Sequence, residues 1–72
     1  MNKKIKIKIR VNGKLLMVNE SLSVLDFLKK LKIPIKKVAI ELNQEIVDKN
    51  ILSKVRLKKN DKIEIVHFIG GG

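Results

Sequence analysis

The sequence contains no cysteine, so its 72 residues form no disulfide bond and no thiolate metal site, and they offer no cysteine nucleophile. It has a single histidine, no nucleophile beside a plausible base, and no glycine-rich phosphate-binding loop. Apolar runs are short, far below the roughly 20 residues that a membrane-spanning helix needs. We therefore expect no catalytic site, no metal site and no membrane partner, in a soluble protein of the cytoplasm.

Acidic residues are few: 7 Asp and Glu stand against 17 Lys and Arg, which gives a formal net charge of +10. This charge raises the hypothesis of a small RNA-binding module. Phosphate-binding surfaces favour arginine, which contacts phosphate through two hydrogen bonds, yet Arg10 and Arg56 are the only arginines. The chain also lacks Trp and Tyr, and Phe27 and Phe68 stand apart, so no stacking platform is indicated. A general richness in lysine explains the charge better. We expect no nucleic-acid partner, and RNA binding stays a remote alternative.

The length permits one small domain, and an apolar content of 44% is ordinary for a folded chain. The clearest pattern is a strict alternation of Ile or Val with Lys or Arg over residues 4–11, which is typical of a half-buried strand. Asn12 and Gly13 follow, and this pair tolerates the two positive φ angles of a type I′ turn. Residues 14–18 supply the returning strand, so the chain is predicted to open with a β-hairpin.

Residues 20–31 change to a helical period. Ser23 can cap the helix through its hydroxyl, with Asp26 three residues later as a capping-box partner. Four apolar residues at helical spacing form a stripe that we expect to face the core: Val24, Phe27, Leu28 and Leu31. Pro34 is predicted to end the helix, because proline cannot continue the backbone hydrogen bonding.

The rest of the chain predicts further strands joined by turns. The predicted strands are residues 38–42, 45–47 and 62–69, and the predicted turns are residues 43–44 and 60–61. Between them lies an irregular stretch, residues 48–59. Four of its apolar residues are expected to fill the core: Ile51, Leu52, Val55 and Leu57.

This order of elements is that of a β-grasp fold, an α+β arrangement in which one mixed sheet wraps around a single helix. The last strand is expected beside the first and parallel to it, at the centre of the sheet. A long right-handed crossover between the two strands permits this parallel pairing. We expect the domain to span residues 1–69 and a flexible tail to span residues 70–72.

Gly70, Gly71 and Gly72 end the chain. Successive glycines cannot stabilise a fold, because they contribute no side chain and lose the most backbone entropy on ordering. The tail is either a frayed terminus or a thin segment, about 10 Å long when extended, that carries its carboxylate into a narrow active site on another protein. The abrupt change from an apolar strand to bare glycine favours the second interpretation.

Three segments resemble the ThiS sulfur carriers of thiamine biosynthesis, a ubiquitin-like β-grasp family whose members end in a Gly-Gly carboxylate. The segments are residues 38–43 (VAIELN), 45–47 (EIV) and 60–72 (NDKIEIVHFIGGG). Gln44 and Asn60 stand where the family often has glycine, and both remain compatible with a turn. The small subunit of molybdopterin synthase and the ubiquitin-related protein modifiers share the Gly-Gly ending and stay open as alternatives.

The resemblance implies a carrier and not an enzyme, with no cofactor bound to this chain. A ThiF-like adenylyltransferase would use ATP and Mg²⁺ to join the Gly72 carboxylate to AMP, and a persulfide donor would convert it to a thiocarboxylate. A ThiG-like thiazole synthase would then take the sulfur for the thiazole ring of thiamine. Gly70 and Gly71 would thread into these active sites. Activation is needed because a carboxylate is ionised at neutral pH and is a poor electrophile.

Val66 and Phe68 are the candidate docking residues. If Ile63 and Ile65 face the helix, the alternation places Val66 and Phe68 on the uncovered side of the sheet beside the tail, as a patch for a partner. Basic residues of the first strand share that side and favour an acidic partner. In the alternative interpretation, the irregular stretch folds back over the two residues. His67 is given no role in chemistry, because a polar residue near a strand end is common.

Overall fold

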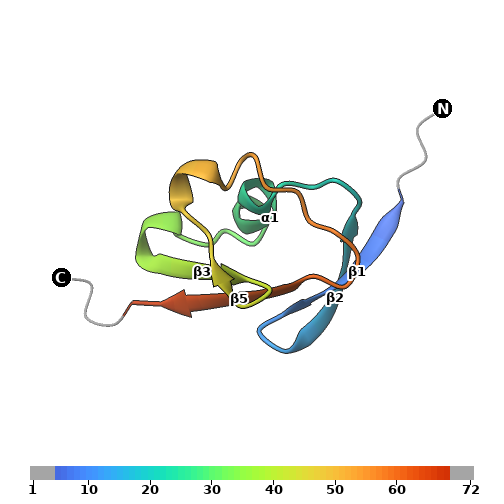
Figure 1. Cartoon of the computed structure of the whole chain (residues 1–72), viewed down its shortest axis with the longest axis horizontal. Helices are drawn as coiled ribbons and strands as arrows, with labels where there is room; N and C mark the ends of the chain where they lie inside the picture. The colour runs from blue at the N-terminus through green and yellow to red at the C-terminus, as the bar shows by residue number, and fades with distance from the viewer. Residues whose placement is uncertain (1–4, 69–72) are drawn as a thin grey trace.

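The computed structural model describes residues 5–68, which form a five-stranded sheet and one α-helix (Figure 1). In chain order the elements are β1 (Lys6–Val11), β2 (Lys14–Asn19), α1 (Val24–Lys30), the 3₁₀ turn η1 (Ile35–Lys37), β3 (Val38–Leu42), β4 (Glu45–Ile46), the 3₁₀ turn η2 (Lys49–Ile51) and β5 (Lys62–His67). The domain limit predicted at residue 69 and the predicted tail at residues 70–72 lie outside the described residues.

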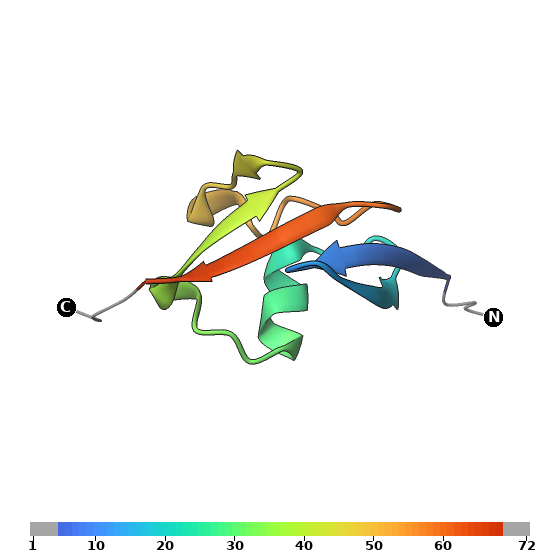
Figure 2. The same cartoon turned by 90° about the horizontal axis from the view of Figure 1, so that it is seen from below.

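The strand order is β2-β1-β5-β3-β4, in which β5 is parallel to β1 and the other neighbouring pairs are antiparallel. The parallel ladder is short, with Arg10 opposite Lys62 and Val11 opposite Ile63. Figure 2 shows β5 between β1 and β3, with α1 against one face of the sheet. This arrangement confirms the predicted β-grasp fold, a mixed sheet wrapped around a single helix.

The hairpin turn forms as predicted. Asn12 and Gly13 have φ angles of 50° and 84°, the two positive values that a type I′ turn requires. Val11 lies opposite Lys14 at the start of the ladder. The residues of β1 that face the helix are partly buried at Ile7 and buried at Ile9 and Val11, whereas Lys6, Lys8 and Arg10 are exposed. The predicted alternation of buried and exposed side chains is therefore present in β1.

The start of α1 is fixed by Ser23, whose Oγ accepts a hydrogen bond from the Asp26 N–H at 3.0 Å. This bond confirms the predicted cap. The helix is shorter than the predicted residues 20–31, because the chain before the cap forms a turn in which Ser21 has a φ of 68°. Ser23 also forms an isolated β-bridge with Arg56, which ties the helix start to the late irregular stretch.

The helix ends at Lys30 in a Schellman motif, four residues ahead of the proline that was predicted to end it. Two backbone hydrogen bonds of 3.0 Å define the motif, from Lys32 N–H to Lys29 O and from Ile33 N–H to Leu28 O. Lys32 adopts the left-handed conformation, with φ of 58°. Leu31 caps the helix and is 43% exposed, so its predicted place in the core is wrong, while the other three residues of the stripe are buried.

The core lies between α1 and the face of the sheet that α1 covers. Its largest fully buried side chains are Ile9, Val24, Leu28, Val38, Ile40, Leu52, Leu57 and Ile63. The irregular stretch contributes Leu52 and Leu57 as predicted, and Val55 packs partly buried against them. Ile51 does not join the core, since it lies in η2 and is 43% exposed.

Candidate functional site

The last strand, β5, separates its residues cleanly between two faces. Ile63 and Ile65 are buried, 1% and 7% exposed, whereas Val66 and Phe68 are 51% and 56% exposed. The predicted strand extended to residue 69, but regular pairing ends at His67. Phe68 continues the pairing between β5 and β3 by one residue, because its N–H donates to the Lys37 carbonyl at 2.9 Å. Both residues are therefore exposed, and the register places Val66 on the face opposite to Ile65, while their role in docking stays a prediction.

The irregular stretch does not cover these two residues, since each keeps about half of its surface exposed. It does reach Phe68 with one side chain: the Nζ atom of Lys49, in η2, lies 5.2 Å from the centre of the Phe68 ring. A cation at this distance is attracted by the electron-rich face of the ring. The contact orients Phe68 and leaves it accessible to a partner.

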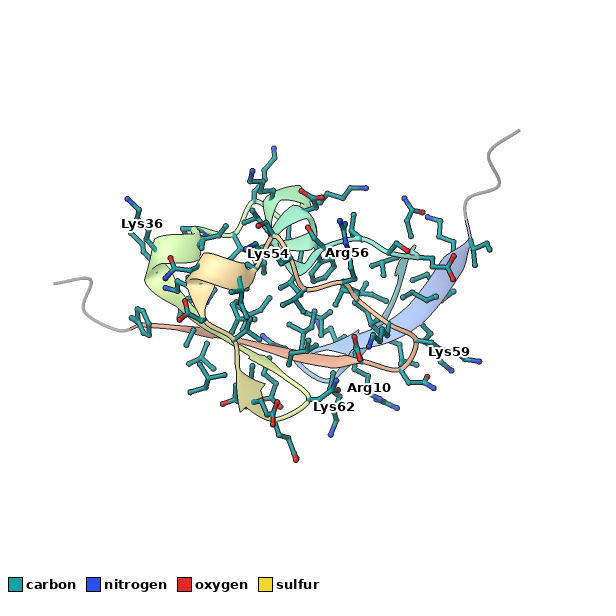
Figure 3. The ribbon with its side chains drawn as sticks, turned by 45° about the horizontal axis from the view of Figure 1, so that its top comes forward. Arg10, Lys36, Lys54, Arg56, Lys59 and Lys62 are labelled. Atoms are coloured by element: carbon teal, nitrogen blue, oxygen red, sulfur yellow. The ribbon has the colours of Figure 1, made fainter. Side chains whose placement is uncertain are left out.

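Val66 belongs to a larger surface, which we call the open face, on the side of the sheet turned away from α1. Cross-strand partners share a face, and the register therefore assigns to the open face Lys6, Lys8, Arg10, Leu15, Met17, Ala39, Glu41, Ile46, Lys62, Glu64 and Val66. Figure 3 shows Arg10 and Lys62 next to each other on this surface. The open face is therefore basic over β1 and apolar toward the end of β5.

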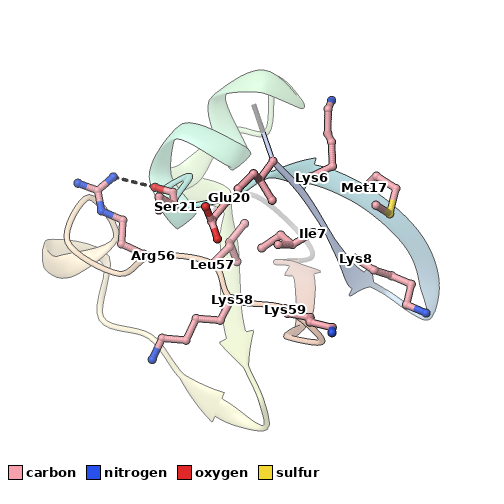
Figure 4. A pocket seen from close by; sticks show the side chains of 11 residues that line it. Lys6, Ile7, Lys8, Met17, Glu20, Ser21, Arg56, Leu57, Lys58 and Lys59 are labelled. Atoms are coloured by element: carbon pink, nitrogen blue, oxygen red, sulfur yellow. Dashed lines mark hydrogen bonds between the residues drawn. The ribbon is translucent and has the colours of Figure 1, made fainter. Parts of the chain in front are cut away.

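A second feature is a cavity of about 690 Å³ between β1 and the chain that leads into β5 (Figure 4). Five cationic residues line it, Lys6, Lys8, Arg56, Lys58 and Lys59, and Glu20 is its one acidic lining residue. Arg56 is held by a hydrogen bond of 3.1 Å from Nη1 to the Ser21 carbonyl. Sequence analysis did not predict this basic groove, because the groove forms from segments that are brought together by the tertiary fold.

The titratable side chains of the described residues form no metal-binding cluster. Among residues 5–68, no group of three or more His, Cys, Asp or Glu side chains lies close enough together to hold a metal ion. His67 is exposed at the end of β5. The carboxylate of buried Asp61 accepts hydrogen bonds from the Lys58 N–H at 2.7 Å and from Asn43 Nδ2 at 3.0 Å. Asp61 thus has a structural role in holding the turn before β5.

No helix in the described part of the chain combines the length and the apolar character that crossing a membrane requires. Gly70, Gly71 and Gly72 lie outside the described residues, so their predicted roles stay predictions. The strand that leads to them ends at the opposite end of the molecule from the start of β1 (Figure 1).

A family model, a curated relative and a solved structure all relate this chain to the ThiS family. The model of the ThiS family matches residues 6–72. The sulfur carrier protein ThiS of Bacillus subtilis is 37% identical over 65 residues, which cover 89% of this chain and 98% of that protein. A crystal structure of the thiamine biosynthesis protein ThiS from Geobacter metallireducens superposes with a TM-score of 0.81 at 35% identity, covering 92% of this chain and 100% of that one.

A thiazole synthase of Paramagnetospirillum magneticum is also similar, with 41% identity over 66 residues. These residues cover 92% of this chain but 20% of that protein. The chain therefore spans about a fifth of this relative, and a thiazole synthase of Magnetococcus marinus shows the same 20% coverage at 36% identity.

Proposed function

Because the chain belongs to the ThiS family, we propose that it is a sulfur carrier of thiamine biosynthesis and that it carries the sulfur on the carboxylate of Gly72. The observation that supports this proposal most directly is the arrangement around the end of β5. An exposed apolar pair, Val66 and Phe68, lies just before three glycines that have no side chains to obstruct entry into an active site.

The proposed reaction begins with activation of the carboxylate. A ThiF-like adenylyltransferase, using ATP and Mg²⁺, joins a Gly72 carboxylate oxygen to AMP and releases pyrophosphate. The terminal sulfur of a persulfide then attacks the acyl carbon and displaces AMP, which gives an acyl disulfide. A thiol must next break the S–S bond, and this leaves the thiocarboxylate on Gly72. Gly70 and Gly71 provide the narrow segment that threads into the active site.

A ThiG-like thiazole synthase is the proposed acceptor of the sulfur. Support comes from the two thiazole synthases described above, in which a region similar to this chain makes up a fifth of a longer protein. A carrier region and an acceptor enzyme that work together gain effective concentration when one chain contains both. The same comparison favours the thiamine branch over the molybdopterin and protein-modifier alternatives.

We further propose that Val66 and Phe68 form the docking patch for these enzymes. Exposed apolar residues that become buried against a partner contribute most of the affinity when they lie at the centre of an interface. Lys49, which lies over the Phe68 ring, restrains the aromatic side chain before binding. Arg10 and Lys62 extend the surface with positive charge and favour partners that are acidic there.

The test is reconstitution of the sulfur transfer. The chain is mixed with its cognate adenylyltransferase, ATP, Mg²⁺, a persulfide donor and a thiol that breaks the acyl disulfide, and its intact mass is measured. We expect replacement of one carboxylate oxygen by sulfur. A chain that lacks Gly70, Gly71 and Gly72 is the matched control and should stay unmodified. No mass change in the full-length chain, or equal modification of the shortened one, would falsify the proposal.

A further inference from the structure

The strand β2 forms one edge of the sheet and keeps an unused set of backbone hydrogen-bonding groups. The Glu20 N–H donates to the Ile5 carbonyl at 2.7 Å, which fixes the alternation of the β1–β2 ladder. Leu16 and Val18 therefore bond to β1, while Leu15 and Met17 direct their N–H and C=O groups away from it. Within residues 5–68, no backbone group pairs with Leu15 or Met17 on that outer side.

Edge strands of natural proteins are usually protected against pairing with another chain, by short length, proline, a bulge or charged side chains. β4, at the other edge of the sheet, has only 2 residues. β2 has 6 residues in unbroken register and contains no proline. Its central residues Leu15, Leu16 and Met17 are 53%, 38% and 58% exposed. β2 is thus long, regular and apolar, which is typical of an edge that accepts a strand.

An apolar groove adjoins this edge, in the angle between β2 and α1. It encloses about 220 Å³, and its apolar lining includes Leu16, Val18, Leu22, Phe27 and Leu31. Leu31, the helix cap, lies outside the core, and its 43% exposed side chain forms part of the groove wall. A strand added to β2 would direct every second side chain into this groove, since side chains alternate between the two faces of a sheet.

The charge around the groove identifies the chemistry of the added strand. Lys6 and Lys30 line the groove and Lys14 begins β2, whereas no Asp or Glu lines it. On the open face, Arg10 lies opposite Leu15 and Lys8 opposite Met17. A second copy of this chain would bring an equal charge of +10 to the same place, so pairing between copies is opposed by repulsion. Acidic residues are the complement of this site.

We propose that β2 binds an extended segment of another protein, with apolar residues at alternate positions and Asp or Glu at its flanks, by strand addition next to the β2–α1 groove. Backbone hydrogen bonds to Leu15 and Met17 give affinity, and the groove selects the inward side chains. This site goes beyond the proposed sulfur transfer, because β1 separates β2 from the docking patch on β5. A protein bound at β2 leaves Val66 and Phe68 accessible.

The experiment uses the full-length chain and a synthetic fluorescent peptide, in which a short run of valine and isoleucine is flanked by aspartates. Fluorescence anisotropy measures the affinity for the peptide. Changes in the backbone amide chemical shifts of the chain show which of its residues the peptide contacts. We expect shifts at Leu15 and Met17 and around the groove, and weaker binding by a peptide with lysine flanks. Shifts confined to Val66 and Phe68, equal binding of both peptides, or dimers of the chain itself joined through β2 would each overturn the proposal.

Two variants test the mechanism of binding. Met17→Pro removes a backbone N–H that faces away from β1, so it blocks strand addition while the sheet keeps its own bonds. Leu31→Gln removes one apolar wall of the groove. Each should weaken binding about tenfold or more, the equivalent of about 1.4 kcal/mol. Ile46→Gln, on the opposite edge strand β4, is the matched control and should bind as the unmodified chain does.

Circular dichroism establishes that each variant is folded. Thiocarboxylate formation on Met17→Pro should match that of the unmodified chain, which separates this proposal from the sulfur-carrier proposal. A folded Met17→Pro chain and a folded Leu31→Gln chain that both bind the acidic peptide with unchanged affinity would contradict strand addition at β2.

Discussion

The side-chain amide of Asn12 forms two hydrogen bonds with the backbone of Ile65, in the central strand of the sheet. Its Oδ1 accepts from the Ile65 N–H at 2.7 Å, and its Nδ2 donates to the Ile65 carbonyl at 3.2 Å. The parallel ladder between β1 and β5 has only two residue pairs. The amide of Asn12 thus continues that ladder beyond the point where β1 turns into the hairpin, and Asn12 serves both the turn and the sheet.

Replacement of Asn12 by alanine should lower the free energy of unfolding by about 2–3 kcal/mol, because Ile65 loses two hydrogen bonds and alanine tolerates a positive φ poorly. Urea unfolding followed by circular dichroism measures the change. Gln44→Ala is the control, since Gln44 also has a positive φ, 72°, and its side chain forms no hydrogen bond within residues 5–68. An equal loss in both variants would show that the amide bonds contribute nothing.

Replacement of Lys32 by glycine should raise the free energy of unfolding by about 0.5–1 kcal/mol, because glycine adopts the left-handed conformation of the Schellman motif without steric cost. The same substitution two residues earlier provides the comparison. Lys30→Gly lies within the helix and should lower the free energy by about 1 kcal/mol. Urea unfolding distinguishes the two, and a loss of stability in Lys32→Gly would contradict the role assigned to this position.

Leu52 and Ile51 are neighbours that should respond very differently to truncation. Leu52→Ala leaves a cavity in the core and should cost about 2–5 kcal/mol, since Leu52 is fully buried. Ile51→Ala removes a side chain that is 43% exposed, and it should cost less than about 1 kcal/mol. Thermal unfolding of the two variants measures the difference. Similar losses would mean that the irregular stretch packs differently from the structure described.

Truncation of the proposed docking patch should impair sulfur loading and leave the fold intact. Phe68→Ala and Val66→Ala should each lower kcat/KM of the adenylyltransferase about tenfold, as for central residues of an interface. Leu31→Ala is the control, because it removes an exposed leucine at the end of α1, next to β2, which β1 separates from β5. Unchanged kcat/KM in both patch variants would remove docking from the proposal while loading of Gly72 could still be observed.

Charge reversal on the open face should slow association with the partner enzymes. Arg10→Glu combined with Lys62→Glu reverses two neighbouring charges, and the association rate constant should fall most strongly at low ionic strength. Stopped-flow measurements across a range of salt concentrations give this dependence. Lys54→Glu is the control, since Lys54 lies well apart from Arg10 and Lys62 (Figure 3). An association rate that is independent of salt would argue against electrostatic attraction.

The sequence by itself determined the features that arise from local chemistry. The Asn12–Gly13 turn, the Ser23 cap and the alternation along β1 and β5 formed as predicted. Each depends on the conformational preference of one or two residues, or on a period of two that any half-buried strand imposes. The order of these elements then indicated the β-grasp fold, and the terminal residues indicated the family.

Only the tertiary structure decided where the helix ends and which apolar residues of the irregular stretch become buried. The sequence did not distinguish Leu52 from Ile51, because in an irregular stretch no period relates a residue to the core. It placed Leu31 in the core and inside the helix, one residue past the observed end at Lys30, and it assigned the stop to Pro34, since no glycine marked the Schellman motif that Lys32 forms. The Asn12–Ile65 bonds, the basic groove and the unpaired edge of β2 all join residues that are far apart in the chain. They follow from strand order and register, which no local preference specifies.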